Sequence, residues 1–285
     1  MNKKAVFVLM GQSNAVGHAL PMAEEDKILS PMKNVFGLHR DHNQSFDIDK
    51  LTWSGYTSGG MNLGETQDHT YSIANCLAAN WQAHIDAGNE RNLPDLYIVQ
   101  IAIGAEGVTE KFMWYPEKEM ILVPGKLGKA NIALFPFAMH ILSLVKESLG
   151  DCDFVGVHWR GGEQDISALM EDDSIDLAGI YTTMLQGFNN ALKTPPTVLH
   201  KIVAKDRMLL EETGKKLQIM YDINDMFDAF TKQYPNVSTF DVRTFPGYDS
   251  TVPGEGLFMD DHVHFTVDVN KWVAKEIFEG YCPAK

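Results

Sequence analysis

The feature that most constrains the fold is a regular alternation of short apolar runs with longer amphipathic stretches. The apolar runs are rich in β-branched residues and span residues 5–10, 96–103, 154–159, 197–204 and 237–242. Helical spacing of apolar residues is found between them, over residues 70–85, 132–149, 175–191, 223–233 and 267–278. Strands that alternate with helices form βαβ units, and their right-handed crossovers give a parallel sheet covered on both faces. We therefore expect an α/β fold, a three-layer α/β/α sandwich around a parallel, five-stranded, flavodoxin-like sheet.

The domain organisation follows from chain length and from two segments that break this alternation. A chain of 285 residues is long enough for one large domain, so residues 1–285 are expected to form a single unit. The exceptions are residues 21–65, rich in Gly, Asp and Asn, and residues 108–129, which include Trp114 and Tyr115. Long connections in compact domains are often functional, so both are predicted to be loop insertions that face the substrate. The alternative is that they are only surface insertions.

The net charge of −14 argues against nucleic acid and against an anionic membrane, because both would be repelled. A neutral small molecule fits this charge best, and an acidic one would need a local cation such as Arg160. Three well-separated cysteines argue against a disulfide framework and against a cysteine-ligated metal.

Localisation is predicted from the first residues and from the length of the apolar runs. The N-terminal residues enter the first strand directly and leave no room for a signal peptide, so we expect a cytoplasmic protein, or a secreted or periplasmic one if a signal has been removed. No apolar run reaches the roughly 18 residues of a membrane helix.

The first chemically informative stretch is FVLMGQSNAVG, residues 7–17. Gly11 ends the buried strand at a sharp turn and places Ser13 at the strand exit. Ligands of open α/β sheets bind at this edge, so Ser13 is a candidate nucleophile. The alternative is that Ser13 or Asn14 only caps the following helix.

A base and its orienting acid are predicted near the C-terminus, in FMDDHVHF, residues 258–265. Asp261 and His264 are three residues apart in a loop, so a short turn can bring the carboxylate to the imidazole Nδ1 and turn Nε2 toward Ser13. Two alternatives stay open. His262 and His264 could share a face as metal ligands, or His264 could be purely structural.

Two further strands end in glycine-containing stretches, IAIGAEG at residues 101–107 and VGVHWRGGEQD at residues 155–165. Backbone N–H groups at Gly104 and Gly107 could approach a developing oxyanion because glycine lets another group come close. With the serine and histidine motifs, four candidate stretches are expected at one edge of the sheet.

Taken together, GQSN, IAIGAEG, WRGGEQD and DHVH resemble the four conserved blocks of the SGNH hydrolases. The closer resemblance is to the branch of sialate O-acetylesterases and acetylxylan esterases, carbohydrate esterase family six. This resemblance implies that Ser13 is the nucleophile, His264 the base and Asp261 its orienting acid, with N–H groups of Ser13 and Gly104 in the oxyanion hole. Ala15 replaces the second glycine of the G-x-S-x-G elbow, which disfavours an ordinary α/β-hydrolase.

Two positions depart from the family pattern. Gly161 stands where the family has a glutamine whose amide resembles an oxyanion donor, and the second block reads Gly104-Ala105-Glu106 instead of G-G-T. Loss of one donor lowers turnover about a hundred- to a thousandfold, unless Arg160 supplies a replacement. Arg160 could instead bind a substrate carboxylate, or form a solvent-facing pair with Glu163.

The sequence thus predicts a serine esterase that removes O-acetyl groups from a carbohydrate, such as a sialic acid or a xylan-type sugar, through an acyl-enzyme. No cofactor and no metal are expected, and the partner is a small-molecule or oligosaccharide acetyl ester. The alternatives are a carbohydrate-binding protein with impaired catalysis and a metal-dependent hydrolase. Side chains expected to contact the substrate are those of Gln12, Asn14, Arg160 and Glu163.

Overall fold

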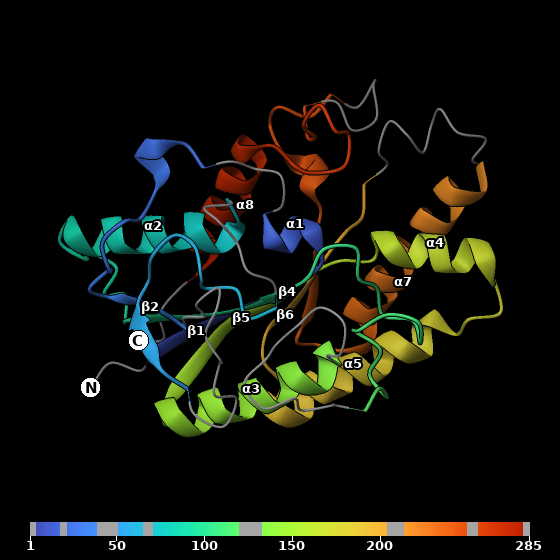
Figure 1. Cartoon of the computed structure of the whole chain (residues 1–285), viewed down its shortest axis with the longest axis horizontal. Coiled ribbons are helices and arrows are strands. Elements are labelled where there is room, and N and C mark those ends of the chain that lie inside the picture. Colours follow the sequence, from blue (N-terminus) through green and yellow to red (C-terminus); the bar gives the residue numbers. More distant parts are fainter. Residues whose placement is uncertain are drawn as a thin grey trace.

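A computed structural model describes residues 4–17, 22–38, 51–64, 71–119, 133–203, 214–249 and 256–281. Helices pack on both faces of one mostly parallel sheet (Figure 1). The strands are β1 (Lys4–Gly11), β2 (Val35–Leu38), β3 (Trp53–Gly55), β4 (Leu96–Ala102), β5 (Cys152–Arg160), β6 (Thr197–His200) and β7 (Val237–Phe240). The α-helices among these residues are α1 (Ser13–Val16), α2 (Ile73–Asp86), α3 (Leu134–Leu149), α4 (Glu163–Glu171), α5 (Leu177–Leu192), α7 (Gly214–Gln233) and α8 (Val267–Gly280).

The sheet runs in the order β3-β2-β4-β1-β5-β6-β7. Five of these strands, β4, β1, β5, β6 and β7, are the predicted ones, and they lie parallel in the flavodoxin-like order 2-1-3-4-5. The prediction of five strands is nevertheless wrong, because the described residues form seven. β2 pairs parallel with β4, and β3 pairs antiparallel with β2 at that edge. Both lie in the predicted insertion 21–65, of which residues 39–50 fall outside the described residues.

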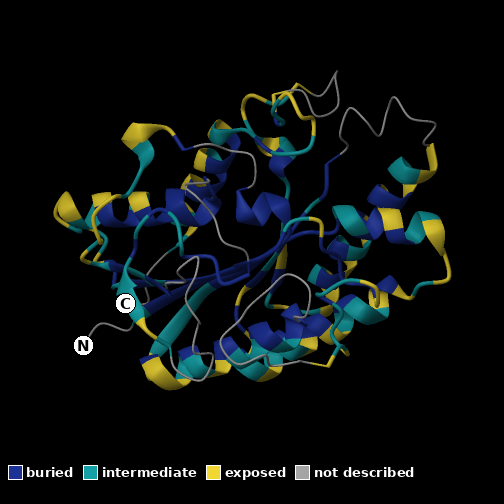
Figure 2. Ribbon diagram, in the orientation of Figure 1, coloured by how far each residue is buried: buried dark blue, intermediate teal, exposed yellow. Residues whose placement is uncertain are grey.

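Strand β1 is buried on both faces. All six residues from Ala5 to Met10 have no exposed surface, as expected for a central parallel strand covered by two helical layers (Figure 2). Alternate side chains point to opposite faces, so Val6 and Val8 pack in the layer of α3, α5 and α7, whereas Phe7 and Leu9 pack in the layer of α2 and α8. The expected three-layer α/β/α sandwich is confirmed.

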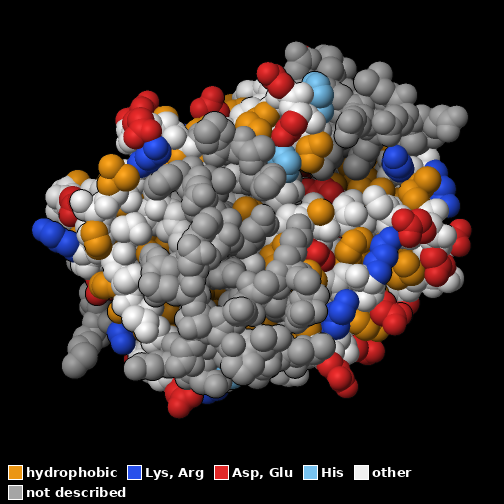
Figure 3. Space-filling view, in the orientation of Figure 1, with side chains coloured by type: hydrophobic (Ala, Val, Ile, Leu, Met, Phe, Trp, Pro, Cys, Tyr) orange, Lys and Arg blue, Asp and Glu red, His pale blue; other side chains and the backbone are white. Residues whose placement is uncertain are grey.

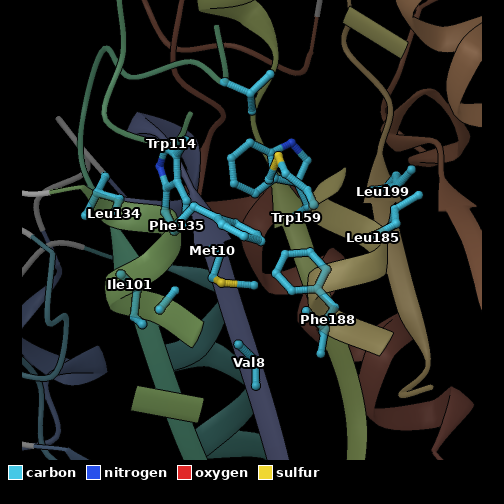
Figure 4. Packing of buried hydrophobic residues seen from close by; sticks show 14 of the residues in the cluster. Val8, Met10, Ile101, Trp114, Leu134, Phe135, Trp159, Leu185, Phe188 and Leu199 are labelled. Carbon is cyan, nitrogen blue, oxygen red and sulfur yellow. The ribbon is translucent and has the colours of Figure 1, made fainter. Parts of the chain in front are cut away.

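A cluster of large side chains supports the carboxyl end of β1 from one layer (Figure 4). The rings of Trp114 and Trp159 meet edge to face at 5.1 Å. The Trp114 indole N–H donates to the Gly11 carbonyl at 3.2 Å. The described part of the predicted insertion 108–129 is therefore fastened to the core through Trp114, while residues 120–129 lie outside the described residues.

The surface agrees with the negative net charge, since the face in Figure 3 carries many Asp and Glu side chains with Lys and Arg between them. No helix in the described ranges combines the length and apolar character needed to cross a membrane. Cys76 is buried and Cys152 half-buried, both as free thiols, and Cys282 lies outside the described residues.

Candidate active site

Strand register brings the first three motifs to one edge of the sheet. Gly11, the last residue of β1, pairs with Ala102 on β4 and with Arg160 on β5. After β1 the chain forms β2, β3 and β4 on one side of that strand, and then β5, β6 and β7 on the other side. The carboxyl end of β1 is therefore a topological switch point, where ligands bind in open α/β sheets.

Gly11 sets the geometry of the turn after β1. Its φ is +139°, and a Cβ at this position would lie 2.0 Å from the Arg160 carbonyl oxygen. Only glycine permits this approach, which lets the Gln12 N–H donate to the same carbonyl at 3.1 Å. Ser13 follows as the first residue of α1 and is 7% exposed. Gln12 occupies the cap position, so the alternative that Ser13 or Asn14 caps this helix does not hold.

The acid–base motif forms a small hairpin before α8. Backbone bonds join Met259 N–H to the His264 carbonyl at 2.8 Å and Thr266 N–H to the Leu257 carbonyl at 2.9 Å. His262 stands at the tip with a left-handed φ of 54° and is exposed. The hairpin therefore presents Asp261 and His264 on one short loop.

Asp261 is bonded to His264 at two points. Its Oδ2 lies 2.6 Å from His264 Nδ1, and its Oδ1 accepts the N–H groups of Val263 and His264 at 2.9 Å each. Burial acts to raise the pKa of Asp261, but these hydrogen bonds outweigh it and lower the pKa to about 2. The carboxylate is thus ionised and ready to stabilise a positive charge on the imidazole.

The side-chain amide of Asn14 joins this hairpin to the serine turn. Asn14 Oδ1 accepts the Phe265 N–H at 3.1 Å, and Nδ2 donates to the Val263 carbonyl at 3.4 Å. These partners flank His264 on both sides, and Asn14 itself follows Ser13. One amide group therefore joins the loop that carries the candidate base to the turn that carries the candidate nucleophile, although the two lie near opposite ends of the chain.

Arg160 lies beneath this junction and is 3% exposed. Its Nη1 donates to the Asn14 carbonyl at 3.1 Å and to Asn270 Oδ1 on α8 at 2.7 Å, and its guanidinium packs 4.4 Å from the Phe265 ring centre. Burial lowers the pKa of Arg160 to about 10, although the nearby Glu163 opposes the shift. The interpretation as a solvent-facing arginine is therefore wrong, because the side chain is enclosed by protein.

The other residues predicted from the first and third motifs line the same corner. Glu163 Oε1 accepts the Asn14 amide at 3.1 Å, and Gln12 Oε1 accepts the Gln164 N–H at 3.4 Å. Gly161 is buried, and a Cβ there would lie 3.0 Å from the Trp159 ring. The position of the family glutamine thus carries no side chain and adjoins an indole.

The second motif lies beyond β4. Ile103 N–H donates to the Gly11 carbonyl at 3.2 Å, and half-buried Gly104 comes next in the chain. The side-chain amide of Asn62 binds Ala102, the last residue of β4, in two ways. Asn62 Nδ2 donates to the Ala102 carbonyl and Oδ1 accepts the Ala102 N–H, each at 2.9 Å. The strand end before Gly104 is thereby fixed in place.

Sequence reasoning missed Asn62 and Asn270 as supports of this corner. Asn270 interrupts an apolar helix face beside Val269 and Val273, a pattern that signals a buried polar contact. Asn62 stands in an irregular segment and has no such signal. Among the described ranges no three His, Cys, Asp or Glu side chains are grouped so that they could hold a metal ion.

Comparisons with known proteins establish the fold. No protein-family model matches the chain, and no curated protein matches its sequence. Among solved structures, NanS aligns with a TM-score of 0.63 and 15% identity over 98% of this chain and 97% of its own. An Arabidopsis thaliana protein aligns with a TM-score of 0.60 and 14% identity over 97% of both chains.

A third solved structure, a carbohydrate acetylesterase from Xanthomonas citri, aligns at a TM-score of 0.45 and 12% identity, over 96% of this chain and 55% of its own. The two alignments with TM-scores of 0.60 and 0.63 show that this chain shares its fold with NanS and with the Arabidopsis thaliana protein.

Proposed function

We propose that this protein is a serine esterase that removes O-acetyl groups from a carbohydrate. His264 Nε2 takes the proton of Ser13 Oγ as the oxygen attacks the acetyl carbonyl, and Asp261 stabilises the imidazolium. The tetrahedral intermediate collapses, the proton passes to the departing sugar oxygen, and an acetyl-serine remains. Water, deprotonated by His264, attacks that acyl-enzyme and releases acetate and free Ser13.

The observation that carries this proposal is the hydrogen-bonded pair of Asp261 and His264, whose loop is bonded to the amide of Asn14, the residue after Ser13. A base that is oriented by a carboxylate and adjoins a serine hydroxyl is the constellation needed for nucleophilic catalysis.

The proposed oxyanion hole consists of the backbone N–H groups of Ser13 and Gly104. Position 161 adds no side-chain donor, and Arg160 directs its Nη1 toward Asn14 and Asn270. We therefore assign Arg160 to holding the serine turn, and we expect turnover below that of an enzyme with a third donor.

The proposed substrate is a neutral acetylated sugar or oligosaccharide. Carbohydrate as the substrate class rests on the sequence resemblance, and the preference for a neutral one rests on the net charge of −14 and on the burial of Arg160. Gln12 and Glu163 are the polar side chains at this corner that we propose to contact the sugar.

The test combines activity with labelling. An aryl acetate should be hydrolysed without added metal and equally well after chelator treatment, and a serine-directed phosphonate should label the peptide that contains residues 11–14. A panel of acetylated xylo-oligosaccharides and O-acetylated sialic acid then defines the sugar, with faster turnover expected on the neutral members. Binding of these sugars without any hydrolysis would instead favour the carbohydrate-binding alternative.

A further inference from the structure

Asp165, in the first turn of α4, carries a buried carboxyl group that the proposed mechanism does not use. It has no exposed surface. Oδ1 accepts the Val108 N–H at 2.8 Å, and Oδ2 accepts the Tyr181 hydroxyl at 3.1 Å. A buried carboxyl group is unfavourable unless its oxygens are hydrogen-bonded, so each of these bonds stabilises its position.

The partner on Oδ2 is anchored in the core. Tyr181 on α5 is 1% exposed, and its hydroxyl accepts the Trp159 indole N–H from β5 at 3.2 Å. Asp165 therefore ends a chain of hydrogen bonds that begins on the sheet. Its carboxyl group is fixed with respect to β5 rather than to a mobile surface.

The partner on Oδ1 belongs to the loop that leaves β4. This loop is tied at its start, where Ile103 N–H binds the Gly11 carbonyl, and Gly104 lies between that tie and Val108. A Cβ at Gly107 would lie 2.3 Å from Asp165 Oδ1, so the loop backbone passes directly over the carboxyl group. The hydrogen bond from Val108 to Asp165 thus holds the loop at a second point, beyond Gly104.

We propose that Asp165 is a positioning residue that fixes the Gly104 N–H in the oxyanion hole by holding the loop at Val108. The catalytic part of this inference rests on the proposed esterase function. A displaced donor stabilises the oxyanion less while binding the ground-state ester about equally, so the loss appears in kcat rather than in KM.

The experiment compares three variants on an aryl acetate. Asp165→Ala should lower kcat about tenfold to a hundredfold with KM changed by less than about threefold. Asp165→Asn keeps an oxygen for the Val108 N–H and should recover most of kcat. Asp176→Ala is the control, since Asp176 is an exposed carboxylate that caps α5 by accepting the Gly179 N–H at 2.9 Å. It should lower Tm with kcat unchanged.

Equal kcat in Asp165→Ala and wild type, or an equal kcat loss in Asp176→Ala, would overturn the proposal. Amide hydrogen exchange separates this inference from the function itself. Exchange at Val108 and Thr109 should rise in Asp165→Ala relative to Asp176→Ala, whether or not the protein hydrolyses esters. Unchanged exchange in Asp165→Ala would contradict the positioning role. If exchange rises in Asp165→Ala as expected but the wild-type protein hydrolyses no ester, only the esterase proposal is contradicted.

Discussion

The serine turn, residues 11–17, and the acid–base hairpin, residues 256–266, are stabilised in different ways. The serine turn is buried and is bonded to partners far away in the chain, with Asn14 at 3% exposure and Arg160 beneath it. The hairpin is more exposed, with 35% of the Asp261 side chain accessible, and its main bonds are local. Substitutions in the serine turn are therefore expected to affect both stability and the proposed catalysis. Substitutions in the hairpin should affect the proposed catalysis with little change in stability.

The substitution with the largest expected effect is Ser13→Ala in the serine turn. Removing the proposed nucleophile should lower kcat on an aryl acetate by about 10⁴-fold or more, the size of effect known from serine proteases. The lost hydroxyl is small, so the unfolding free energy should change by less than about 1 kcal/mol. Steady-state kinetics and urea denaturation measure both quantities. Wild-type kinetics in a folded Ser13→Ala protein would eliminate this serine as nucleophile.

Asp261→Asn should separate chemistry from stability in the hairpin. The amide cannot stabilise the imidazolium, so kcat should fall about 10³- to 10⁴-fold while KM changes little. Because Asp261 is partly exposed and its bonds are local, Tm should stay within a few degrees of wild type. A drop in stability of several kcal/mol would show that the hairpin is not self-contained.

Arg160→Met should give the opposite pattern, with a large effect on stability. The substitution keeps an apolar stem against Phe265 but leaves the Asn14 carbonyl and Asn270 Oδ1 without their donor. The unfolding free energy should fall by about 2–4 kcal/mol, and kcat should fall for neutral and acidic acetyl esters alike. If only acidic esters are affected, Arg160 binds a substrate carboxylate instead.

The last expected effect is on the pH dependence of stability, and it contrasts two carboxyl groups. Burial raises the pKa of Asp165 to about 7, and the negative charge of nearby Glu163 acts in the same direction. The hydrogen bonds from Val108 and Tyr181 lower this pKa but do not outweigh burial. Between pH 4 and 7 the unfolded state loses this proton while the folded state keeps it, so the Asp165 contribution to stability falls as pH rises.

Asp261 has the reverse sign. Its folded pKa of about 2 means that its contribution is complete above about pH 4 and is lost as pH falls toward 2. Denaturation of Asp165→Asn and Asp261→Asn across pH 2–8 should alter the wild-type profile in these two separate windows. If the free energy of unfolding of Asp165→Asn changed between pH 4 and 7 as steeply as that of wild type, the raised pKa would not belong to Asp165.

Much of the sheet could be predicted because its central strands are long, apolar and flanked by helices. β2 and β3 have four and three residues, and β3 holds its place by pairing with β2, a contact that local sequence does not encode. Helix α4 was missed because it begins inside the third motif and most of its residues are polar. Residues of α7 before position 223 were missed for a similar reason, since they include Lys215 and Lys216.

At the site, the motifs predict which residue types carry the chemistry but not how they are held. Asn62, Asp165 and Asn270 gain their roles only from partners distant in sequence. For Arg160 the sequence leaves three roles open, namely a replacement oxyanion donor, a ligand of a substrate carboxylate and a solvent-facing cation paired with Glu163. Its actual environment depends on Phe265 and α8, more than a hundred positions away.

The bond between Asn14 and Phe265 spans 251 positions of the chain. Synthesis proceeds from the N-terminus, so the ribosome completes the serine turn and every strand of the sheet before residue 265 emerges. Contacts of such separation also form slowly, because a very long loop must close first. A growing chain therefore carries Ser13 long before His264 has been synthesised, and the two regions can meet only after nearly the whole chain has been made.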